Sequence, residues 1–445
     1  MRGILLFGIL LTIFVAGVMP GNVKADGWVP AMGGEPSLVY WRANGTSYVN
    51  VSMVVGSTGF NVSDWGTPIQ KGKSVSVNAL IWMWTGYTFP IMITLSHTYD
   101  LGKLPAGEYA FLFRVWGLPR KHITFTSCTT VPDNYPTIQE AINNSSEEDQ
   151  IFVRNGKYYE NIVINKPLAV VGEGKSNTVI DGNFSGHTVE ISANNVTFSG
   201  FTVGNSSSSH SGIFLYCAQY ARIMHNTIVG NFYGVNHDRA SYNSLFDNTI
   251  EGNQHSAVAF KCDSPFPVIE NTIYLNSICN NQIGIYFDGN AYNNTVLRNY
   301  LVNNSVGVDL FYCGAGCNAI VQNNIIATQR CAVVFDDRGH KWDRGYPLGG
   351  NYWSDYVGTD SDQDGIGDTP YVINENNIDN YPLMHPWKLG DTNYDGTITV
   401  LDLIVIAYVL GSKPEDANWN PRADVKEDNI INVLDLILTA KYLGT

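Results

Sequence analysis

Charged side chains are scarce in this sequence, and basic ones are the scarcest. Only 15% of the 445 residues are charged, and 26 lysines and arginines stand against 40 aspartates and glutamates, for a formal net charge of −14. A chain with this balance lacks the basic surface with which proteins bind nucleic acid or anionic membranes. Its carboxylates concentrate toward the C-terminus, so cations are the partners that its charge favours.

The sequence also lacks a second long apolar run. The one such run, residues 4–18, follows Arg2 and precedes the small-residue sequence Val23-Lys24-Ala25, which is typical of a signal peptide over residues 1–25. The run is short for a membrane span. We therefore expect a secreted, extracellular protein, either free or attached to a cell surface.

Motifs for soft metals are missing as well. The seven cysteines include no Cys-x-x-Cys pair, and methionines and histidines do not cluster. Copper binding needs soft sulfur or imidazole ligands close together. The sequence therefore argues against a copper site.

Residues 26–126 are rich in strand-like runs separated by Gly, Pro and Asp turns. The runs cover residues 47–55, 74–84, 91–99, 108–116 and 121–126. Short strands at this spacing over about 100 residues predict an immunoglobulin-like β-sandwich.

A short pattern recurs between residues 189 and 337. Each copy reads Asn-Thr-Ile or a close variant, continues through a polar stretch, and then opens a second alternating run with a small residue. The marker asparagines are Asn226, Asn248, Asn271, Asn299 and Asn323, and the small residues are Gly212, Gly234, Ala257, Gly284, Gly307 and Ala332. Both markers keep a period of about two dozen residues, which indicates the coils of a β-solenoid.

Alternation within each repeat predicts which side chains face the solenoid interior. The first inward set is Ile213, Val235, Val258, Ile285, Val308 and Val333, and the second is Leu215, Phe260, Phe287, Leu310 and Phe335. We expect equivalent side chains of successive coils to stack, and the marker asparagines to hydrogen-bond to one another at a turn.

These repeats resemble the right-handed parallel β-helix of pectate-lyase-like and NosD-like proteins, which carry the same Asn-x-Ile and Gly-Ile/Val signature. The resemblance implies a mainly β chain with a pectin-lyase-like β-helix over residues 128–387. At its start, Thr137-Ile-Gln-Glu140 is a capping-box pattern. We expect a short helix through Asn144 to cover the open end of the first coil.

Outward positions of the Gly-led runs form two columns of aromatic and acidic side chains. One column is Phe214, Asn236, Ala259, Tyr286, Asp309 and Val334, and the other is Tyr216, Asp238, Lys261, Asp288, Phe311 and Asp336. Aromatic rings stack on sugars, while carboxylates bond to hydroxyls or transfer protons. This face is therefore the candidate polysaccharide site.

Within this face, Asp288 and Asp309 are the predicted catalytic carboxylates. Ideal coil geometry places them roughly 8 Å apart, inside the ~6.5–9.5 Å window of an inverting pair. The remaining candidates are Lys261 and Asp238 for catalysis, and Tyr216, Asn236, Tyr286 and Asp336 for substrate binding. His237, if it faces outward, is a further proton carrier, and Asp336-Asp337 with His340 could extend the site.

A purely structural interpretation of this face stays open. Asp238, Lys261 and Asp288 also suit a plain surface charge ladder, which contributes little. The motifs of polygalacturonases and the arginine-centred sites of pectate lyases do not occur in order. Catalysis, glycan binding without turnover, and a structural role are therefore all compatible with the sequence.

An acidic segment follows the repeats. Asp360, Asp362, Asp364 and Asp368 alternate around Gly365, a spacing that wraps oxygen ligands about Ca²⁺. An acidic turn without metal is the alternative, but four crowded carboxylates repel one another in the absence of a cation. The segment resembles the C-terminal end of NosD-like β-helices and implies a calcium-binding cap.

The last segment, residues 388–445, contains a duplicated calcium loop followed by a helix. The predicted ligands are Asp391, Asn393, Asp395, Thr397 and Asp402 in loop one, and Asp424, Asp428, Ile430 and Asp435 in loop two. The two copies align without a gap from Val400 and from Val433. This duplication resembles a type I dockerin, which implies a cohesin domain as partner; an ordinary EF-hand pair is the alternative.

Two departures from the dockerin pattern concern loop two. Lys426 stands at its third position and Asn429 replaces the glycine of loop one, so we expect weaker calcium binding there. The residues after each loop that would contact cohesin, Val400-Leu401 and Val433-Leu434, are apolar in both copies.

The leading hypothesis is a secreted, polysaccharide-directed β-helix protein, either binding or degrading, attached through its dockerin to a cohesin-bearing partner. If it is an enzyme, we expect a polysaccharide lyase or a glycosyl hydrolase. The alternatives are a non-catalytic surface or adhesion protein and, more weakly, a NosD-like periplasmic copper-handling protein.

Overall fold

The computed structural model describes residues 28–444 except 31–35, 44–45, 56–58, 86–91, 103, 105–106, 116–117, 263–265, 314–316, 327–328 and 336–337. The expected signal peptide and Asp336 lie outside the described residues. The chain divides into two compact units, one of residues up to Pro136 with Asp149–Ile151, the other of Thr137–Glu148 with Phe152–Thr445.

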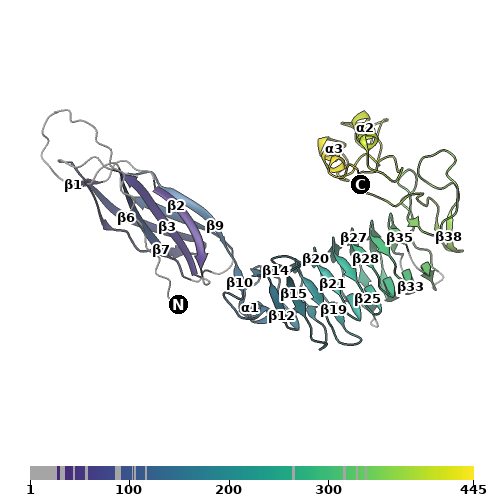
Figure 1. The fold of residues 1–445 in the computed structure, drawn as a ribbon, viewed down its shortest axis with the longest axis horizontal. Helices are drawn as coiled ribbons and strands as arrows, with labels where there is room; N and C mark the ends of the chain where they lie inside the picture. The colour runs from purple at the N-terminus through teal and green to yellow at the C-terminus, as the bar shows by residue number, and fades with distance from the viewer. Residues whose placement is uncertain are drawn as a thin grey trace. The chain divides into compact units, whose positions relative to one another are not determined.

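The first unit is a β-sandwich (Figure 1). One sheet has the order β1-β6-β8-β9, with β4 and β5 also paired to β6, and the other has the order β2-β3-β7. The strands are β1 (Trp28–Pro30), β2 (Pro36–Ala43), β3 (Thr46–Val55), β4 (Phe60–Asp64), β5 (Ile69–Lys71), β6 (Ser74–Trp84), β7 (Ile93–Asp100), β8 (Gly107–Val115) and β9 (Lys121–Ser127). The five predicted strands are confirmed as β3, β6, β7, β8 and β9.

Strict alternation builds the core of this sandwich. Val49, Val51 and Met53 of β3 are fully buried, and Phe111 and Phe113 of β8 meet them from the other sheet in one apolar cluster. Each strand therefore has one inward and one outward face, as the period of two requires.

The second unit begins with helix α1 (Ile138–Asn144), as predicted. The Thr137 side chain accepts a hydrogen bond from the Glu140 N–H. Glu160 satisfies two more of the free N–H groups at the helix start, because its carboxylate accepts from Ile138 and Gln139 at 2.9 and 3.0 Å. The buried face of α1 packs beside β13.

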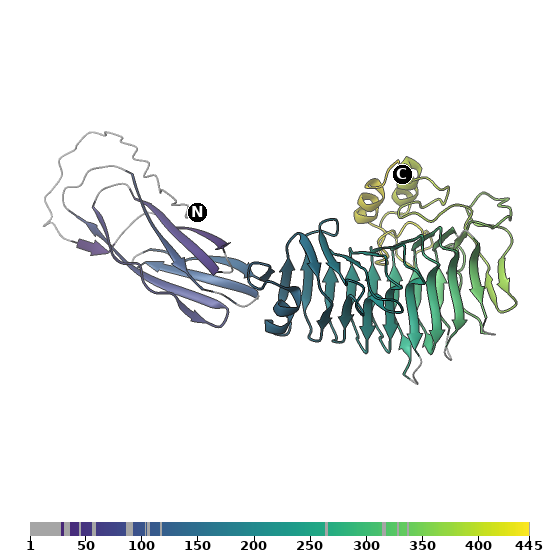
Figure 2. The ribbon, with the colours of Figure 1, turned by 60° about the horizontal axis from the view of Figure 1, so that its bottom comes forward.

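Three parallel sheets then form the coils of a β-helix (Figures 1 and 2). The first sheet includes β14 (Ala169–Gly172), β17 (Thr197–Ser199), β20 (Arg222–Met224), β23 (Ser244–Phe246), β27 (Thr272–Tyr274), β31 (Thr295–Leu297) and β34 (Ala319–Val321). The second is β12 (Gly156–Tyr159), β15 (Thr178–Asp181), β18 (Thr202–Gly204), β21 (Thr227–Val229), β24 (Thr249–Glu251), β28 (Ser277–Cys279), β32 (Tyr300–Val302), β35 (Asn324–Ile326) and β37 (Tyr352–Trp353).

The third sheet carries the Gly-led runs. It consists of β13 (Ile162–Ile164), β16 (Val189–Ile191), β19 (Ser211–Tyr216), β22 (Tyr233–Asp238), β25 (Ser256–Cys262), β29 (Ile283–Gly289), β33 (Val306–Tyr312) and β36 (Arg330–Val334). The short pairs β26 (Val268–Ile269) with β30 (Ala291–Tyr292), and β38 (Tyr371–Asn374) with β39 (Asn377–Asp379), complete the solenoid and its end. Strands β10 (Thr129–Val131) and β11 (Gln150–Val153) fall at the division between the two units.

Asparagine ladders line the turns, and the described residues of the β-helix contain three of them where the sequence predicted one. At each step the Oδ1 of one asparagine accepts from the backbone N–H of its counterpart on the preceding coil, at 2.9–3.1 Å. The ladders are Asn226, Asn248, Asn276, Asn299, Asn323, Asn351; Asn231, Asn253, Asn281, Asn304; and Asn243, Asn271, Asn294, Asn318.

The placement of Asn271 in the predicted ladder was therefore wrong. Asn248 bonds to Asn276, while Asn271 bonds to Asn243 and Asn294. This coil contains two similar motifs, Asn271-Thr-Ile and Asn276-Ser-Ile. Because extra residues between β25 and β26 lengthen the coil, the second motif supplies the asparagine that bonds to Asn248.

The small residues of the repeat are required because successive backbones approach closely there. A Cβ on Gly234 would lie 2.4 Å from the Ala257 carbonyl oxygen, and one on Gly307 would lie 2.5 Å from that of Cys331. Cys331, not Ala332, is thus the counterpart of Gly307. Since Val308 pairs with Ala332 and Asp309 with Val333, the predicted positions of Val333 and Val334 are exchanged.

The other predicted interior residues are confirmed. The buried set includes Ile213, Leu215, Val235, Val258, Phe260, Ile285, Phe287, Val308 and Leu310. Phe335 is the exception, because its side chain is 63% exposed. It follows the last strand of the sheet, where no further coil covers it.

The chain ends in a small helical segment beside the last coils of the β-helix, seen in both ribbon views (Figures 1 and 2). Helices α2 (Val400–Tyr408) and α3 (Val433–Ala440) each start with a capping box, formed by Thr399 with Asp402 and by Asn432 with Asp435. Within the described part of the chain, no helix has the length and apolar character needed to cross a membrane.

Candidate functional site

The outer face of the third sheet brings together most of the predicted sugar-site residues. Asn236 pairs with Ala259, Ala259 with Tyr286, and Tyr286 with Asp309 across successive coils. Lys261 pairs with Asp288 in the neighbouring column. Parallel in-register stacking thus creates this cluster from four different strands.

Asp309 has the most unusual surroundings on this face. Its carboxyl group is about half-buried, and its Oδ1 has no hydrogen-bond partner among the described residues. Burial, and secondarily the carboxylate of Asp288, raise the pKa of Asp309 from 3.8 to about 6. A carboxyl group with such a pKa suits a general acid, and a second carboxylate beside it supplies a proton acceptor.

Tyr286 connects the two carboxylates. Burial, followed by the charge of Asp288 and a hydrogen bond to it, raises the pKa of the Tyr286 hydroxyl, and Asp309 adds to this effect. A β-bulge between Phe287 and Asp288 shifts the register, so that Asp288 lies opposite Tyr312. The predicted pairing of Asp288 with Phe311 was therefore wrong, because a bulge is invisible to a count on ideal geometry.

His255 belongs to the cluster but was not predicted. Its ring makes edge contacts with Tyr233 and Tyr286 at centroid distances of 5.0 and 5.2 Å. Burial and the charge of Lys261 lower its pKa, while Asp288 opposes this shift. Its Nδ1 is buried without a partner among the described residues. His255 directly precedes β25, outside the alternating positions on which the prediction relied.

Histidines 237 and 340 face inward. His237 is fully buried, stacks on Phe260 at 4.8 Å, and has its pKa lowered by burial to about 4. His340 ends the third asparagine ladder, where its Nδ1 accepts from the Asn318 N–H. Neither histidine is therefore on the sugar-facing surface, and the proposed extension through His340 was wrong.

Tyr216 and Asp238, at the far end of the predicted face, already interact with a residue of the same chain. The guanidinium of Arg239 lies 5.5 Å above the Tyr216 ring, donates to its hydroxyl at 3.2 Å, and approaches Asp238 at 3.7 Å. Asn236 is buried, and its Oδ1 has no partner among the described residues. On this face, the buried polar atoms without a hydrogen-bond partner among the described residues thus include Asn236 Oδ1, His255 Nδ1 and Asp309 Oδ1.

The three acidic loops share one backbone conformation. The fourth residue of each loop, Gln363, Tyr394 or Glu427, has a positive φ, and so does the sixth, Gly365, Gly396 or Asn429. In each loop the sixth N–H donates to the first aspartate, at 3.0, 3.0 and 2.9 Å respectively. This geometry turns the side chains of positions one, three and five toward a common centre.

The cap loop and loop one fit a hard cation well. Ligand oxygens of Asp360, Asp362 and Asp364 all lie within 4.8 Å of one another, and Asp364 has a buried oxygen that accepts no hydrogen bond among the described residues, although the Arg422 guanidinium lies 3.8 Å from it. Asp391 has such an oxygen too, and burial together with Asp402 raises its pKa to about 6. Carboxylates crowded in this way are stabilised by a divalent cation.

Two predicted ligand sets differ from this pattern. Asp368 accepts hydrogen bonds from the hydroxyls of Thr359 and Ser361, at 3.0 and 2.7 Å, and is not part of the cap-loop group. In loop two the ammonium of Lys426 lies 2.9 Å from Asp428. A lysine therefore already neutralises part of the second loop.

The helices that follow the loops keep apolar side chains in solvent. Val400 and Leu401 of α2 are 62% and 54% exposed, and Val433 and Leu434 of α3 are 59% and 43% exposed. Exposed apolar pairs on both copies are typical of a surface that another protein covers.

Two family models match the chain. Residues 142–358 match the model of the periplasmic copper-binding protein NosD, and residues 389–444 match the type I dockerin domain. Type I dockerin domains bind calcium and imply a cohesin partner.

Curated relatives and solved structures are similar over limited stretches. The probable ABC transporter binding proteins NosD of Stutzerimonas stutzeri and Pseudomonas aeruginosa are 33% and 28% identical over 97 and 154 residues, 22% and 35% of this chain. The chain spans only 21% and 32% of their lengths. The alignment with a pectin methylesterase from carrot covers 46% of this chain and 85% of the esterase, with a TM-score of 0.31 and 13% identity. The alignment with the catalytic unit of an alpha-1,3-glucanase of Streptomyces thermodiastaticus covers 73% of this chain and 94% of the glucanase, with a TM-score of 0.21 and 10% identity.

The repeats, their ladders and the paired calcium-type loops agree with the two family models. The chain thus combines a NosD-like β-helix with a C-terminal type I dockerin domain.

Proposed function

We propose that this chain is an exported, polysaccharide-directed protein that its dockerin attaches to a cohesin-bearing partner. The sugar would bind on the outer face of the third sheet, around Asp288 and Asp309. The observation that carries the proposal is the half-buried carboxyl of Asp309, which has an oxygen without a hydrogen-bond partner among the described residues and a raised pKa beside a second carboxylate. Such an arrangement costs stability and has no structural use on a solenoid surface.

Each member of the cluster has a role in this proposal. Asp309 donates the proton to the glycosidic oxygen, and Asp288 acts as the base that activates water or abstracts a proton from the sugar. Tyr286 and His255 present ring surfaces for the sugar. Lys261 balances the charge of the carboxylates.

The first experiment is a screen of the purified chain, with calcium, against acidic and neutral polysaccharides. Reducing ends without ultraviolet absorbance indicate a hydrolase, whereas unsaturated products indicate a lyase. Asp309→Asn and Asp288→Asn should each reduce turnover by about 10²–10⁴-fold with the fold unchanged. Asp247→Asn, on an exposed turn away from this face, is the matched control.

Binding without turnover would make the face a glycan-recognition surface, and the same two variants should then weaken binding. If the chain neither cleaves nor binds any of the polysaccharides, the proposal is overturned and a spacer role for the β-helix is favoured.

We further propose that calcium occupies the three acidic loops. The ligands would be Asp360, Asp362 and Asp364 in the cap; Asp391, Asn393, Asp395, Thr397 and Asp402 in loop one; and Asp424, Asp428, Ile430 and Asp435 in loop two, with Asp368 ordering the cap loop from outside. Oxygen donors of this kind prefer calcium to copper. Calorimetric titration of the chelator-treated chain tests this, and exclusive binding of copper would contradict it.

A further inference from the structure

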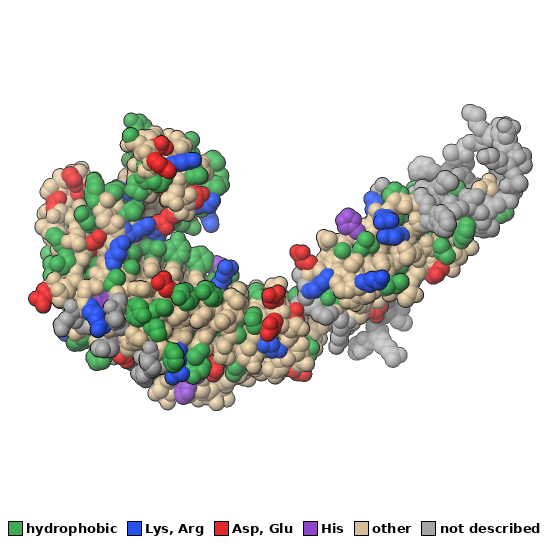
Figure 3. All heavy atoms as spheres, turned by 180° about the vertical axis from the view of Figure 1, so that it is seen from behind, with side chains coloured by type: hydrophobic (Ala, Val, Ile, Leu, Met, Phe, Trp, Pro, Cys, Tyr) green, Lys and Arg blue, Asp and Glu red, His purple; other side chains and the backbone are tan. Residues whose placement is uncertain are grey.

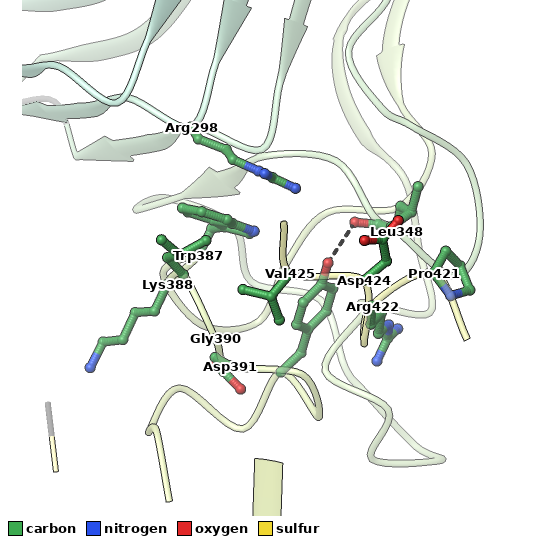
Figure 4. Close-up of a pocket in the computed structure, with 12 residues that line it drawn as sticks. Arg298, Leu348, Trp387, Lys388, Gly390, Asp391, Pro421, Arg422, Asp424 and Val425 are labelled. Atoms are coloured by element: carbon green, nitrogen blue, oxygen red, sulfur yellow. Dashed lines mark hydrogen bonds between the residues drawn. The ribbon is translucent and has the colours of Figure 1, made fainter. Parts of the chain in front are cut away.

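The calcium loops of the dockerin contact the β-helix of the same chain. Each dockerin loop directs its fourth side chain, Tyr394 in loop one and Glu427 in loop two, away from the ligand centre and onto the last coils. In Figure 3, basic and apolar side chains lie along this junction, and Figure 4 shows the pocket between the two parts.

Tyr394 is almost completely buried there. Its exposed fraction is 7%, its hydroxyl donates to the Leu348 carbonyl at 3.1 Å, and Gln322 donates to that hydroxyl at 3.2 Å. The first of these bonds is the dashed line in Figure 4. A residue of a calcium loop is thus part of the packing of the β-helix end.

Glu427 forms the second contact. Its Oε1 accepts from Arg298 and from Arg344, both at 2.6 Å. The side chain of Arg298 is only 7% exposed and lies 4.5 Å above the Trp387 ring. Arg298 and Gln322 occupy equivalent turns on consecutive coils, so the stacking of the coils sets the spacing of this docking surface.

Arg422, between the two dockerin loops, forms the third contact. It donates to the Pro347 carbonyl at 2.6 Å and to the Asp364 carbonyl at 2.8 Å, and its guanidinium lies 4.1 Å above the Tyr394 ring. Asp364 is itself a residue of the cap loop. The cap loop and loop one of the dockerin therefore meet at this one guanidinium.

The glycines of the loops permit this close approach. A Cβ on Gly365 of the cap loop would lie 2.5 Å from Tyr394, and one on Gly396 of loop one would lie 2.9 Å from His385. Both glycines also have positive φ angles of +83° and +84°. Any other residue there would disturb the calcium-loop backbone and the docking contact together.

We propose that the calcium-loop end of the dockerin is a docking surface for its own β-helix, and that calcium controls the docking. The same loop conformation that surrounds the cation aims Tyr394 and Glu427 at the β-helix. Calcium affinity and docking must therefore strengthen each other by the same factor.

This arrangement leaves the apolar faces of α2 and α3 open to a partner, since Val400, Leu401, Val433 and Leu434 all stay exposed. A calcium-loaded chain would then present its β-helix to a cohesin-bearing partner in one fixed orientation. Without calcium, only the connecting chain would join the β-helix to the dockerin, and their relative orientation would not be fixed.

The test uses hydrogen exchange of the full chain, followed by mass spectrometry, with saturating calcium and with chelator. Peptides around Gln322 and Leu348, which are outside every calcium loop, should exchange about tenfold faster after chelation. Asp391→Ala with Asp424→Ala, at saturating calcium, should give the same deprotection. This double variant leaves the cap loop intact and so separates docking from calcium binding by the cap.

A second measurement tests reciprocity. Glu427→Gln, and separately Arg298→Ala with Arg344→Ala, should weaken calcium binding by the dockerin by about fivefold, while Arg222→Ala, on an exposed strand position elsewhere in the β-helix, should not. Glu427 is on the surface of its loop, so its variant keeps the fold. Unchanged protection of Gln322 and Leu348 on chelation, or unchanged calcium affinity in both variants, would overturn the proposal.

Discussion

The asparagine ladders of the β-helix and the acidic loops at its C-terminal end both bury polar side chains, but their partners differ. In a ladder, Asn276 donates to the Leu245 and Tyr274 carbonyls and to Asn299, and accepts from Asn248. In loop one, a buried oxygen of Asp391 has no partner among the described residues.

The difference follows from charge. A neutral amide carries both donors and acceptors, so a stack of amides satisfies itself, and each new coil extends it. A stack of carboxylates has acceptors alone, and its members repel one another. The ladders therefore complete the fold from within the chain, whereas the loops leave one place for a cation.

Breaking a ladder should have the largest effect. Asn276→Ala leaves the Asn248 N–H and two carbonyls without their bonds, and each such buried group costs about 1–3 kcal/mol. We expect a loss on the order of 3–9 kcal/mol, measured as a lower melting temperature of the β-helix with or without calcium. Asn177→Ala, at an exposed position of the β-helix, is the control. A calcium-dependent loss in Asn276→Ala would contradict the self-sufficiency of the ladders.

Removing the cation should be the next largest effect, and it should reach the loops and the docking surface around Gln322 and Leu348 but not the asparagine ladders. At a free calcium concentration about a hundredfold above Kd, binding stabilises the folded state by about 2.7 kcal/mol. Chelation should therefore lower the melting temperature of the dockerin and reduce its helical circular dichroism. Asp391→Ala should reproduce most of this change at saturating calcium. An equal shift in the β-helix transition would show that the two regions do not differ as we describe.

A substitution that strengthens calcium binding by loop two should have a moderate effect on its calcium affinity. Lys426→Asn removes the ammonium that now pairs with Asp428 and restores the oxygen ligand of loop one at the same position. We expect calcium affinity of that loop to rise about tenfold, measured by calorimetry. Lys441→Asn, on the C-cap residue of α3, should leave the affinity unchanged. If both lysine variants behave alike, the ion pair in the loop is not what weakens it.

Asp309 sharpens the comparison, because it is a half-buried carboxyl outside the loops with an oxygen that has no hydrogen-bond partner among the described residues. Its folded-state pKa of about 6 exceeds the ordinary value of 3.8, so the folded state binds more protons and stability falls as pH rises between these values. Asp309→Asn should remove that slope and stabilise the chain near neutral pH by about 1 kcal/mol, since partial exposure screens the effect. Melting temperatures across about pH 4–7 measure it. A parallel pH profile in both proteins would contradict the burial argument.

Much of the repeat architecture was predictable because it depends on local periodicity. Alternation placed Val258 and Phe287 inside, and the loop spacing predicted that Asp391 and Asp402 lie close together. Errors arose where a coil departs from the average length. Asn271 was assigned to the wrong ladder, and Val333 and Val334 were exchanged at the last coil.

The candidate sugar face was predictable as a surface but not in its chemistry. Spacing alone brought Tyr286, Asp288 and Asp309 to one side of the third sheet. The bulge at Asp288, the ring of His255 and the buried oxygen of Asp309 depend on how neighbouring coils settle against one another. No count along the chain contains that information.

The solenoid period and the spacing of the acidic loops follow from the chain alone, because each rests on short-range spacing that the backbone must obey. Tertiary packing sets which asparagines bond to one another, which carboxyl group is shielded from solvent, and that Tyr394 and Glu427 join the dockerin to the β-helix. These features join residues from 22 to 129 positions apart in the chain, and only the packing of complete coils brings such residues into contact.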